Sequence, residues 1–125
     1  MDGVPDSPGQ TSFLFDLDGT LIDSVYQHVL AWREALQSVG VSLAVWKLHR
    51  RIGMSGGLFV NALARELETP LDAETLAALP GLHAEAFIRR YDSVQALPGA
   101  RRRVLAAAFA TRHLCGLLQQ DPSAP

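Results

Sequence analysis

The sequence predicts a mostly α-helical chain with one β-strand near its start, and two observations carry this prediction. The apolar run Phe13–Leu17 is followed by turn residues, and a short bounded run of this kind is typical of a buried strand. From Val25 onward, apolar residues recur every three or four positions, with capping residues and breakers between the segments. We therefore expect one strand at about Ser12–Leu17, followed by four or five helices.

Two acids stand at the end of the expected strand. Side chains alternate along an extended chain, so Asp16 and Asp18 should share one side of it. Gly19 and Thr20 then form a flexible turn whose backbone N–H groups can point at an anion. Paired carboxylates beside such a turn suit a divalent cation and a phosphate. A solvated acidic corner is the alternative, and the flanking residues, Asp23 and a serine among them, weigh against it.

The expected helices follow in order. Asp23 or Ser24 can cap a helix that Gly40 closes, and Ser42 can cap a second helix at about Leu43–Ile52. The remaining segments are about Leu58–Leu67, a short helix from Asp72 to Leu79 that Pro80-Gly81 breaks or kinks, and Leu82–Tyr91. We assign Trp32, Trp46, Met54 and Phe87 to the core among these helices and take His49 as a helix-surface histidine.

The run Phe13–Ser24 resembles the first motif of the haloacid dehalogenase-like (HAD) hydrolase superfamily, Asp-x-Asp-Gly-Thr followed by an acid and a serine. The resemblance implies that Asp16 is the nucleophile that takes a phosphoryl group, and that Asp18 is the general acid and base. It also implies Mg²⁺ as cofactor, held by Asp16 and by the main-chain carbonyl of Asp18, because a metal screens the charge when a carboxylate attacks a phosphate. The second aspartate favours phosphoryl transfer over dehalogenation, and Thr20 favours a phosphatase over a phosphomutase.

The helices that follow are similar to the helical cap of phosphoglycolate phosphatase and β-phosphoglucomutase-like members, an insertion in an α/β Rossmann-like core. The glycine-rich segment Gly53–Gly57 resembles the cap loop that helps to select the substrate. The resemblance implies that Arg51, Gly53, Ser55 and Gly56 contact the substrate, with Gly19 and Thr20 at the phosphate. A solvated helix end is the other reading of Arg51.

The resemblance ends just after Pro98-Gly99. The family continues with a phosphate-binding hydroxyl, a lysine or arginine and an acidic pair, whereas this chain has no lysine beyond Lys47 and no acid between Asp92 and Asp121. We therefore expect a family member that is incomplete after the cap, with residues beyond Arg101 resembling a shifted reading frame. The expected organisation is a disordered lead-in at 1–11, strand and catalytic loop at 12–24, cap at 25–93, and a helix then a disordered tail at 94–125.

Composition sets the wider limits. The chain has 125 residues, 48% of them hydrophobic, and a net charge of −2, as in an ordinary soluble domain. This balance predicts no nucleic-acid or membrane partner. The single cysteine, Cys115, fits a cytoplasmic location, and ten arginines against one lysine suggest a GC-rich bacterial gene.

Three functions remain open at this point. The first is a Mg²⁺-dependent phosphatase of a phosphorylated small molecule, with a phosphomutase of the same superfamily as its variant. The second is an inactive fragment or a non-catalytic helical interaction module. The third is a complementing chain that supplies the rest of the core.

Overall fold

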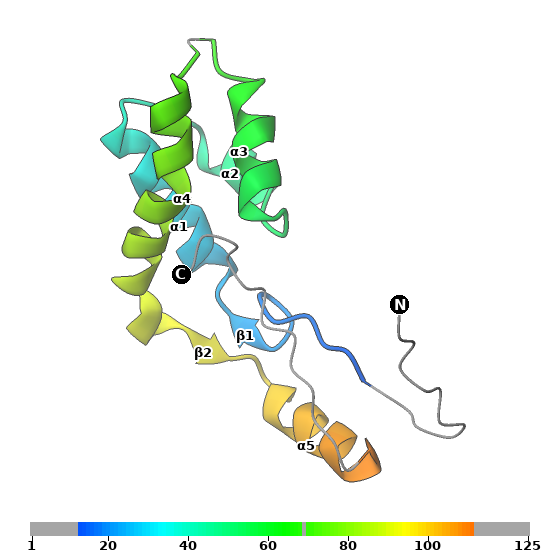
Figure 1. The fold of residues 1–125 in the computed structure, drawn as a ribbon. Helices are drawn as coiled ribbons and strands as arrows, with labels where there is room; N and C mark the ends of the chain where they lie inside the picture. The colour runs from blue at the N-terminus through cyan, green and yellow to red at the C-terminus, as the bar shows by residue number, and fades with distance from the viewer. Residues whose placement is uncertain (1–12, 69, 112–125) are drawn as a thin grey trace, which may run out of the picture.

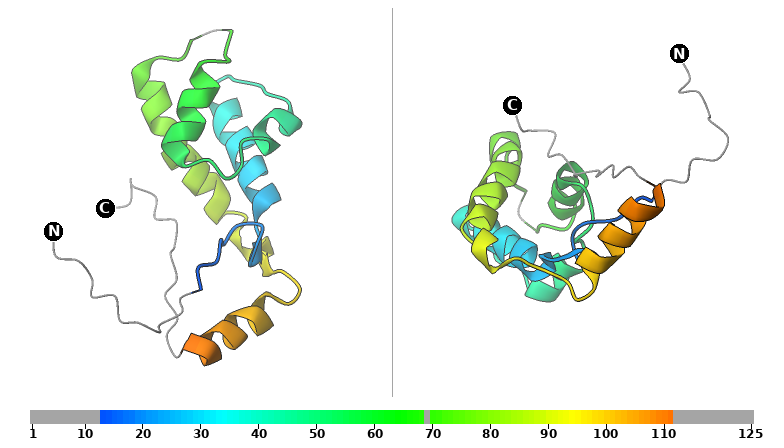
Figure 2. Two further views of the ribbon diagram at one scale, coloured as in Figure 1. Left: turned by 90° about the vertical axis from the view of Figure 1, so that its right-hand side faces the viewer. Right: turned by 90° about the horizontal axis from the view of Figure 1, so that it is seen from below.

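The computed structural model describes residues 13–68 and 70–111, and it is mostly helical (Figure 1). The elements in chain order are β1 (Ile22–Asp23), α1 (Val25–Ser38), α2 (Val45–His49), α3 (Gly56–Ala64), α4 (Ala73–Ile88), a 3₁₀ turn (Tyr91–Ser93), β2 (Gln95–Ala96) and α5 (Ala100–Thr111). Helices α1 to α4 gather at one end of the molecule, and α5 lies at the other end, beyond the two short strands (Figures 1 and 2).

The four-helix group is built around α1 and α4, which lie side by side (Figure 2). Its core is contributed by all four helices, and the buried residues are Val29, Trp32, Leu36, Leu48, Phe59, Val60, Leu63 and Leu79. Trp32 lies between two other rings, with its ring centroid 4.0 Å from that of Phe59 and 4.3 Å from that of His83. The helical periodicity read from the sequence is thus the core-facing stripe of α1, and the placement of Trp32 in the core is confirmed.

A two-stranded antiparallel ribbon joins the helical group to the rest of the chain. Ile22 pairs with Ala96 and Asp23 with Gln95, so the segments that enter and leave the helical group are bonded to each other. The N–H of Leu97 extends this ribbon by donating to the carbonyl of Leu21 at 2.9 Å. The helical group is therefore an insertion between two adjacent strands.

The expected strand at Ser12–Leu17 is wrong for the residues that the structure describes. Residues 13–17 form no strand, and Asp18 makes only an isolated bridge with Ile22. A strand needs a neighbour for its backbone groups, and the described part of the chain offers none here. The start of the apolar run is accordingly exposed, with Phe13 at 46% and Leu14 at 74% of their full accessible surface, whereas Phe15 and Leu17 are half-buried.

Pro80-Gly81 was expected to break or kink the helix, and a break is wrong, because α4 runs through both residues. A kink at this point stays a prediction. Proline in a helix interior removes one hydrogen bond and costs about 3 kcal/mol. Buried contacts before and after the proline, at Leu79 and Ala86, offset this cost by holding both halves of α4 in the helical group. Tertiary packing therefore decides the length of α4.

Two core assignments fail at the short helix α2 and the loop after it. Trp46 is 56% exposed, with the cations of Lys47 and Arg50 each 5.8 Å from its ring, and Met54 is 46% exposed. Helix α2 has only five residues and buries Leu48, so one turn of helix cannot bury Trp46 on its other side. The expected lead-in and the tail after residue 111 lie outside the described residues.

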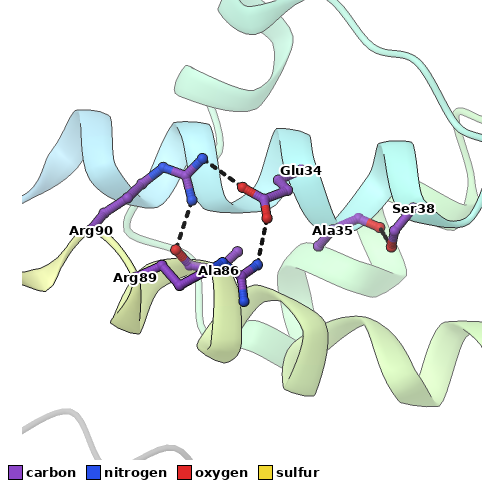
Figure 3. Close-up of polar contacts among 6 residues, drawn as sticks. All are labelled: Glu34, Ala35, Ser38, Ala86, Arg89 and Arg90. Atoms are coloured by element: carbon purple, nitrogen blue, oxygen red, sulfur yellow. Dashed lines mark hydrogen bonds and ion pairs between the residues drawn. The ribbon is translucent and has the colours of Figure 1, made fainter.

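A charge cluster links α1 to the end of α4 (Figure 3). Glu34 forms an ion pair with Arg89 and a second one with Arg90, whose Nη2 lies 2.6 Å from Glu34 Oε2. Hydrogen bonds from the two guanidinium groups, that of Arg89 first, lower the pKa of Glu34. Arg90 also donates to the carbonyl of Ala86 at 2.7 Å, which fixes its side chain along α4.

Candidate active site

The turn after the apolar run holds the first carboxylate. Asp16 is exposed, and its Oδ2 accepts a hydrogen bond from the hydroxyl of Thr20 at 3.0 Å. Gly19 has a φ of +74°, in the left-handed region that glycine adopts without cost. A Cβ at Gly19 would lie 2.8 Å from Cγ2 of Val25, so the turn approaches the start of α1 too closely for a side chain.

The backbone of this turn is bonded internally. The N–H groups of Thr20, Leu21 and Ile22 all reach the carbonyl oxygen of Leu17, at 2.9 to 3.2 Å. The N–H of Gly19 donates to the carbonyl of Ile22 at 2.8 Å. The expectation of free amide groups is thus wrong at Gly19 and Thr20, and an anion would have to compete with these bonds.

The second carboxylate, that of Asp18, is held by side chains from the start of α1. The hydroxyl of Ser24, which is fully buried, lies 2.5 Å from Asp18 Oδ1, and Nε2 of His28 lies 3.3 Å from the same oxygen. Ser24 is the N-cap residue of α1 but makes no capping bond with its side chain. The hydroxyl of Ser24 donates to the Asp18 carboxylate, and this bond orients Asp18.

Sequence reasoning missed the part that His28 plays here. One signal was available, because Ser24 and His28 are four residues apart at the start of a helix and so lie on the same face. The pattern predicts a contact with Asp18 only when the turn at Gly19 is known to bring Asp18 close to the first turn of α1. The two carboxylates also differ in exposure, because Asp16 is exposed and Asp18 is half-buried.

The loop expected to meet the substrate lies between α2 and α3. In Figures 1 and 2 this loop is on the side of the helical group that faces β1 and the turn before it. Gly53 has a φ of +100°, Ser55 is the exposed N-cap residue of α3, and Gly56 begins that helix. Contact of Gly53, Ser55 and Gly56 with a substrate stays a prediction.

Arg51 is already paired in this structure. Its guanidinium forms an ion pair with Glu66 and donates to the carbonyl of Lys47 at 2.5 Å. The hydrogen bond from Arg51 lowers the pKa of Glu66. This bridge joins α2 to the end of α3, so Arg51 has a structural role, and substrate contact by it stays a prediction.

Asp16 and Asp18 are the type of ligand that a hard cation binds, but they are too few to complete its coordination shell. Carboxylate oxygens are suitable Mg²⁺ ligands, yet the ion is normally six-coordinate. Within residues 13–68 and 70–111 no group of three or more His, Cys, Asp or Glu side chains could hold a metal ion. These residues can therefore supply only part of a Mg²⁺ shell, and the rest would come from water, a phosphate or other protein groups.

Comparison with solved structures shows what this arrangement is similar to. The chain matches the crystal structure of a hydrolase from Pseudomonas syringae, with 48% sequence identity and a TM-score of 0.73. The match covers 82% of this chain and 47% of the hydrolase, so the chain spans about half of that protein's length. No family model and no curated protein matches the chain.

The fold of this chain, a helical insertion carried on a two-stranded ribbon, is therefore similar to that of about half of a solved hydrolase. Helices in the described part of the chain are too short or too polar to cross a membrane.

Proposed function

We propose that the chain carries the nucleophile turn and the helical cap of a HAD-type phosphatase that hydrolyses a phosphorylated small metabolite with Mg²⁺. The observation that carries the proposal is the different surroundings of the two carboxylates. Asp16 is exposed at the turn, as a nucleophile that must reach phosphorus should be. Asp18 is half-buried and hydrogen-bonded to Ser24 and His28, as a group that transfers protons in a defined direction should be. The similarity to a solved hydrolase supports the same class of reaction.

The proposed reaction has two steps. A carboxylate oxygen of Asp16 bonds to phosphorus while the bond from phosphorus to the substrate oxygen breaks, and Asp18 gives its proton to that oxygen. Asp18 then takes a proton from water, whose oxygen bonds to phosphorus as the bond to Asp16 breaks. Phosphate leaves and both side chains are restored. Mg²⁺, held in part by the Asp16 carboxylate and the main-chain carbonyl of Asp18, would supply charge neutralisation at the phosphate.

Hydrolysis of p-nitrophenyl phosphate in the presence of Mg²⁺ tests this proposal. We expect turnover by the native chain, none by Asp16→Asn, and native turnover by Asp92→Asn, which changes an exposed aspartate of the 3₁₀ turn. Chelation of the metal should abolish turnover. Turnover by Asp16→Asn equal to that of the native chain would remove the nucleophile assignment. Isomerisation of a sugar phosphate without release of phosphate would indicate the phosphomutase instead.

A second function, a non-catalytic helical interaction module or an inactive fragment, is favoured by one observation. The apolar run at Phe13 and Leu14 has no strand partner among the described residues and is largely exposed. In that case residues 13–17 should exchange their amide hydrogens quickly while α1 and α4 stay protected. Strong protection of residues 13–17 in a monomer contradicts this function. Protection that appears only with an added chain would indicate the complementing partner.

A further inference from the structure

The outer side of α1 and α2 carries exposed aromatic rings together with positive charges. Tyr26, near the start of α1, is 61% exposed, and its ring stacks on that of His49 in α2 with centroids 5.5 Å apart. Trp46 is exposed as well, and the guanidinium of Arg50, four residues further along the chain, lies 5.8 Å from its ring. Two more exposed residues lie on the same side of α1, because they follow Tyr26 at spacings of four and seven. We call this surface the basic aromatic face, and its residues are Tyr26, Leu30, Arg33, Trp46, His49 and Arg50.

The basic aromatic face combines apolar surface with a net positive charge. Its two large rings, those of Tyr26 and Trp46, are outside the core of the helical group. Exposed apolar patches mark contacts with other proteins, and aromatic residues and arginine are the side chains that such interfaces favour. None of the six residues of this face is acidic, and Glu66, at the end of α3, forms its ion pair with Arg51, which is not part of the face. The basic aromatic face therefore suits an acidic surface.

The outer side of α4 has the opposite character. Its exposed residues recur every three or four positions and so share one side of the helix, away from the buried Leu79 and Ala86. We call this side the acidic face, and its residues are Glu74, Ala77, Ala78, Gly81, Glu85 and Ile88.

The acidic face is negative, low in relief and partly apolar. Its two glutamates are about 16 Å apart along the helix axis, and the residues of this face between them are only alanine and glycine. Ile88, at the end of α4, is 71% exposed. Arg89 is next to this face in sequence, but its charge is offset by the ion pair with Glu34. The small residues leave room for bulky side chains from another surface, with a carboxylate on each side.

We propose that the chain associates with a second copy of itself, with the basic aromatic face of one copy against the acidic face of the other. The two faces are complementary in charge, because one carries arginines without acids and the other carries glutamates without bases. They are also complementary in relief, because large rings on one meet alanine and glycine on the other. In both views of Figure 2, α1 lies between α2 and α4, so the two faces lie on different sides of the helical group. The contact is therefore heterologous, and each pair keeps one unused face of each kind to which further copies can bind.

Sedimentation equilibrium of the native chain tests the association. The average mass should rise above that of the monomer as the protein concentration increases. Each face has six residues, fewer than the 20–30 a side of a stable interface, so we expect a weak dissociation constant of about 10 µM to 1 mM. Because opposite charges contribute, association should weaken at an ionic strength of about 1 M, where the screening length is about 3 Å. A native chain that keeps the monomer mass up to about 1 mM overturns the proposal.

Single substitutions test each face in turn. Trp46→Ala and Arg50→Glu alter the basic aromatic face, and each should raise the dissociation constant about tenfold or more. Ala78→Arg places a long cationic side chain in the middle of the acidic face and should have an effect of the same size. All three positions are exposed, and Glu74, four residues before Ala78, favours an arginine there, so these variants should stay folded by circular dichroism. Leu14→Ser, at an exposed leucine outside both faces, is the control and should leave association unchanged.

A mixture of two variants decides whether the two faces bind each other. Trp46→Ala keeps a native acidic face and Ala78→Arg keeps a native basic aromatic face. Equal amounts of the two should form a 1:1 complex of twice the monomer mass, and this mass should not rise further, because no native face remains free. A mixture that associates no better than either folded variant alone overturns the pairing.

The other outcomes are equally decisive. Loss of association in Trp46→Ala and Arg50→Glu but not in Ala78→Arg means that the acidic face takes no part, and it overturns the proposal. Loss in Leu14→Ser means that the apolar run joins the copies instead, and it overturns the proposal too. Neither face contains Asp16 or Asp18, so the result does not depend on whether the chain has phosphatase activity.

Discussion

Replacing Gly19 by alanine tests the geometry of the turn that carries the candidate catalytic acids. Two costs add at this position. The left-handed backbone, with φ of +74°, costs a residue with a Cβ about 1–2 kcal/mol. The new Cβ would lie 2.8 Å from Cγ2 of Val25, and moving that methyl group away from its preferred rotamer costs about 0.5–1.5 kcal/mol more. We therefore expect Gly19→Ala to lower the free energy of unfolding by about 1.5–3.5 kcal/mol.

Gly40 is the matched control. Its φ of +80° is almost the same, but a Cβ there would meet no atom within 4 Å, so Gly40→Ala should cost about 1–2 kcal/mol. Urea unfolding, followed by the fluorescence of the buried Trp32, measures both values. In the Val25→Ala background the cost of Gly19→Ala should fall to that of Gly40→Ala, because the opposing methyl group is gone. Equal costs of Gly19→Ala in both backgrounds would refute the close approach.

Three further predictions concern the helical group and are checked by the same unfolding experiment. Leu63→Ala removes a fully buried side chain and should lower the free energy of unfolding by about 2–5 kcal/mol. Leu58→Ala, at an exposed position of the same helix, should lower it by under about 0.5 kcal/mol. Similar losses of stability in the two variants would contradict the assigned core. Asp72→Ala should cost about 1 kcal/mol, because the Asp72 carboxylate accepts the N–H of Thr75 at 2.7 Å and caps α4, and Asp72→Asn should recover most of it. The arginine partners of Glu34 lower its pKa in the folded chain, so the ionised carboxylate stabilises the fold at pH values above its unfolded pKa of about 4.5. This stabilisation is lost as the pH falls through the pKa of Glu34 in the folded chain. Glu34→Gln should therefore remove part of the loss of stability seen in acid, and an unchanged acid profile would show that the cluster in Figure 3 is not formed in solution.

Local rules in the sequence predicted the helices well where the interactions are local. Asp72 caps α4 as expected, because a capping carboxylate and the N–H three residues later are close in sequence. The stripe of α1 and its end near Gly40 follow from the 3.6-residue period and from a glycine with positive φ. Patterns within about one helical turn were thus sufficient for these elements.

The same local rules failed where distant residues decide the outcome. Pro80 favours a helix end by itself, but packing on both sides of it keeps α4 continuous. The run Phe13–Leu17 has the composition of a strand, but a strand forms only beside another one. Trp46 was expected in the core, yet the helix that carries it is too short to enclose it.

The candidate site likewise has features that the sequence predicts and features that depend on tertiary packing. The sequence by itself determined that two carboxylates, a glycine turn and a serine lie within nine residues, because their spacing along one short segment is enough to place them together. Only the tertiary structure decided which groups orient Asp18, since His83 is 55 residues from His28 and meets it only where α1 and α4 pack. The physical reason is that hydrogen bonds across a helix pair depend on how the helices pack, and that packing is set by the whole core.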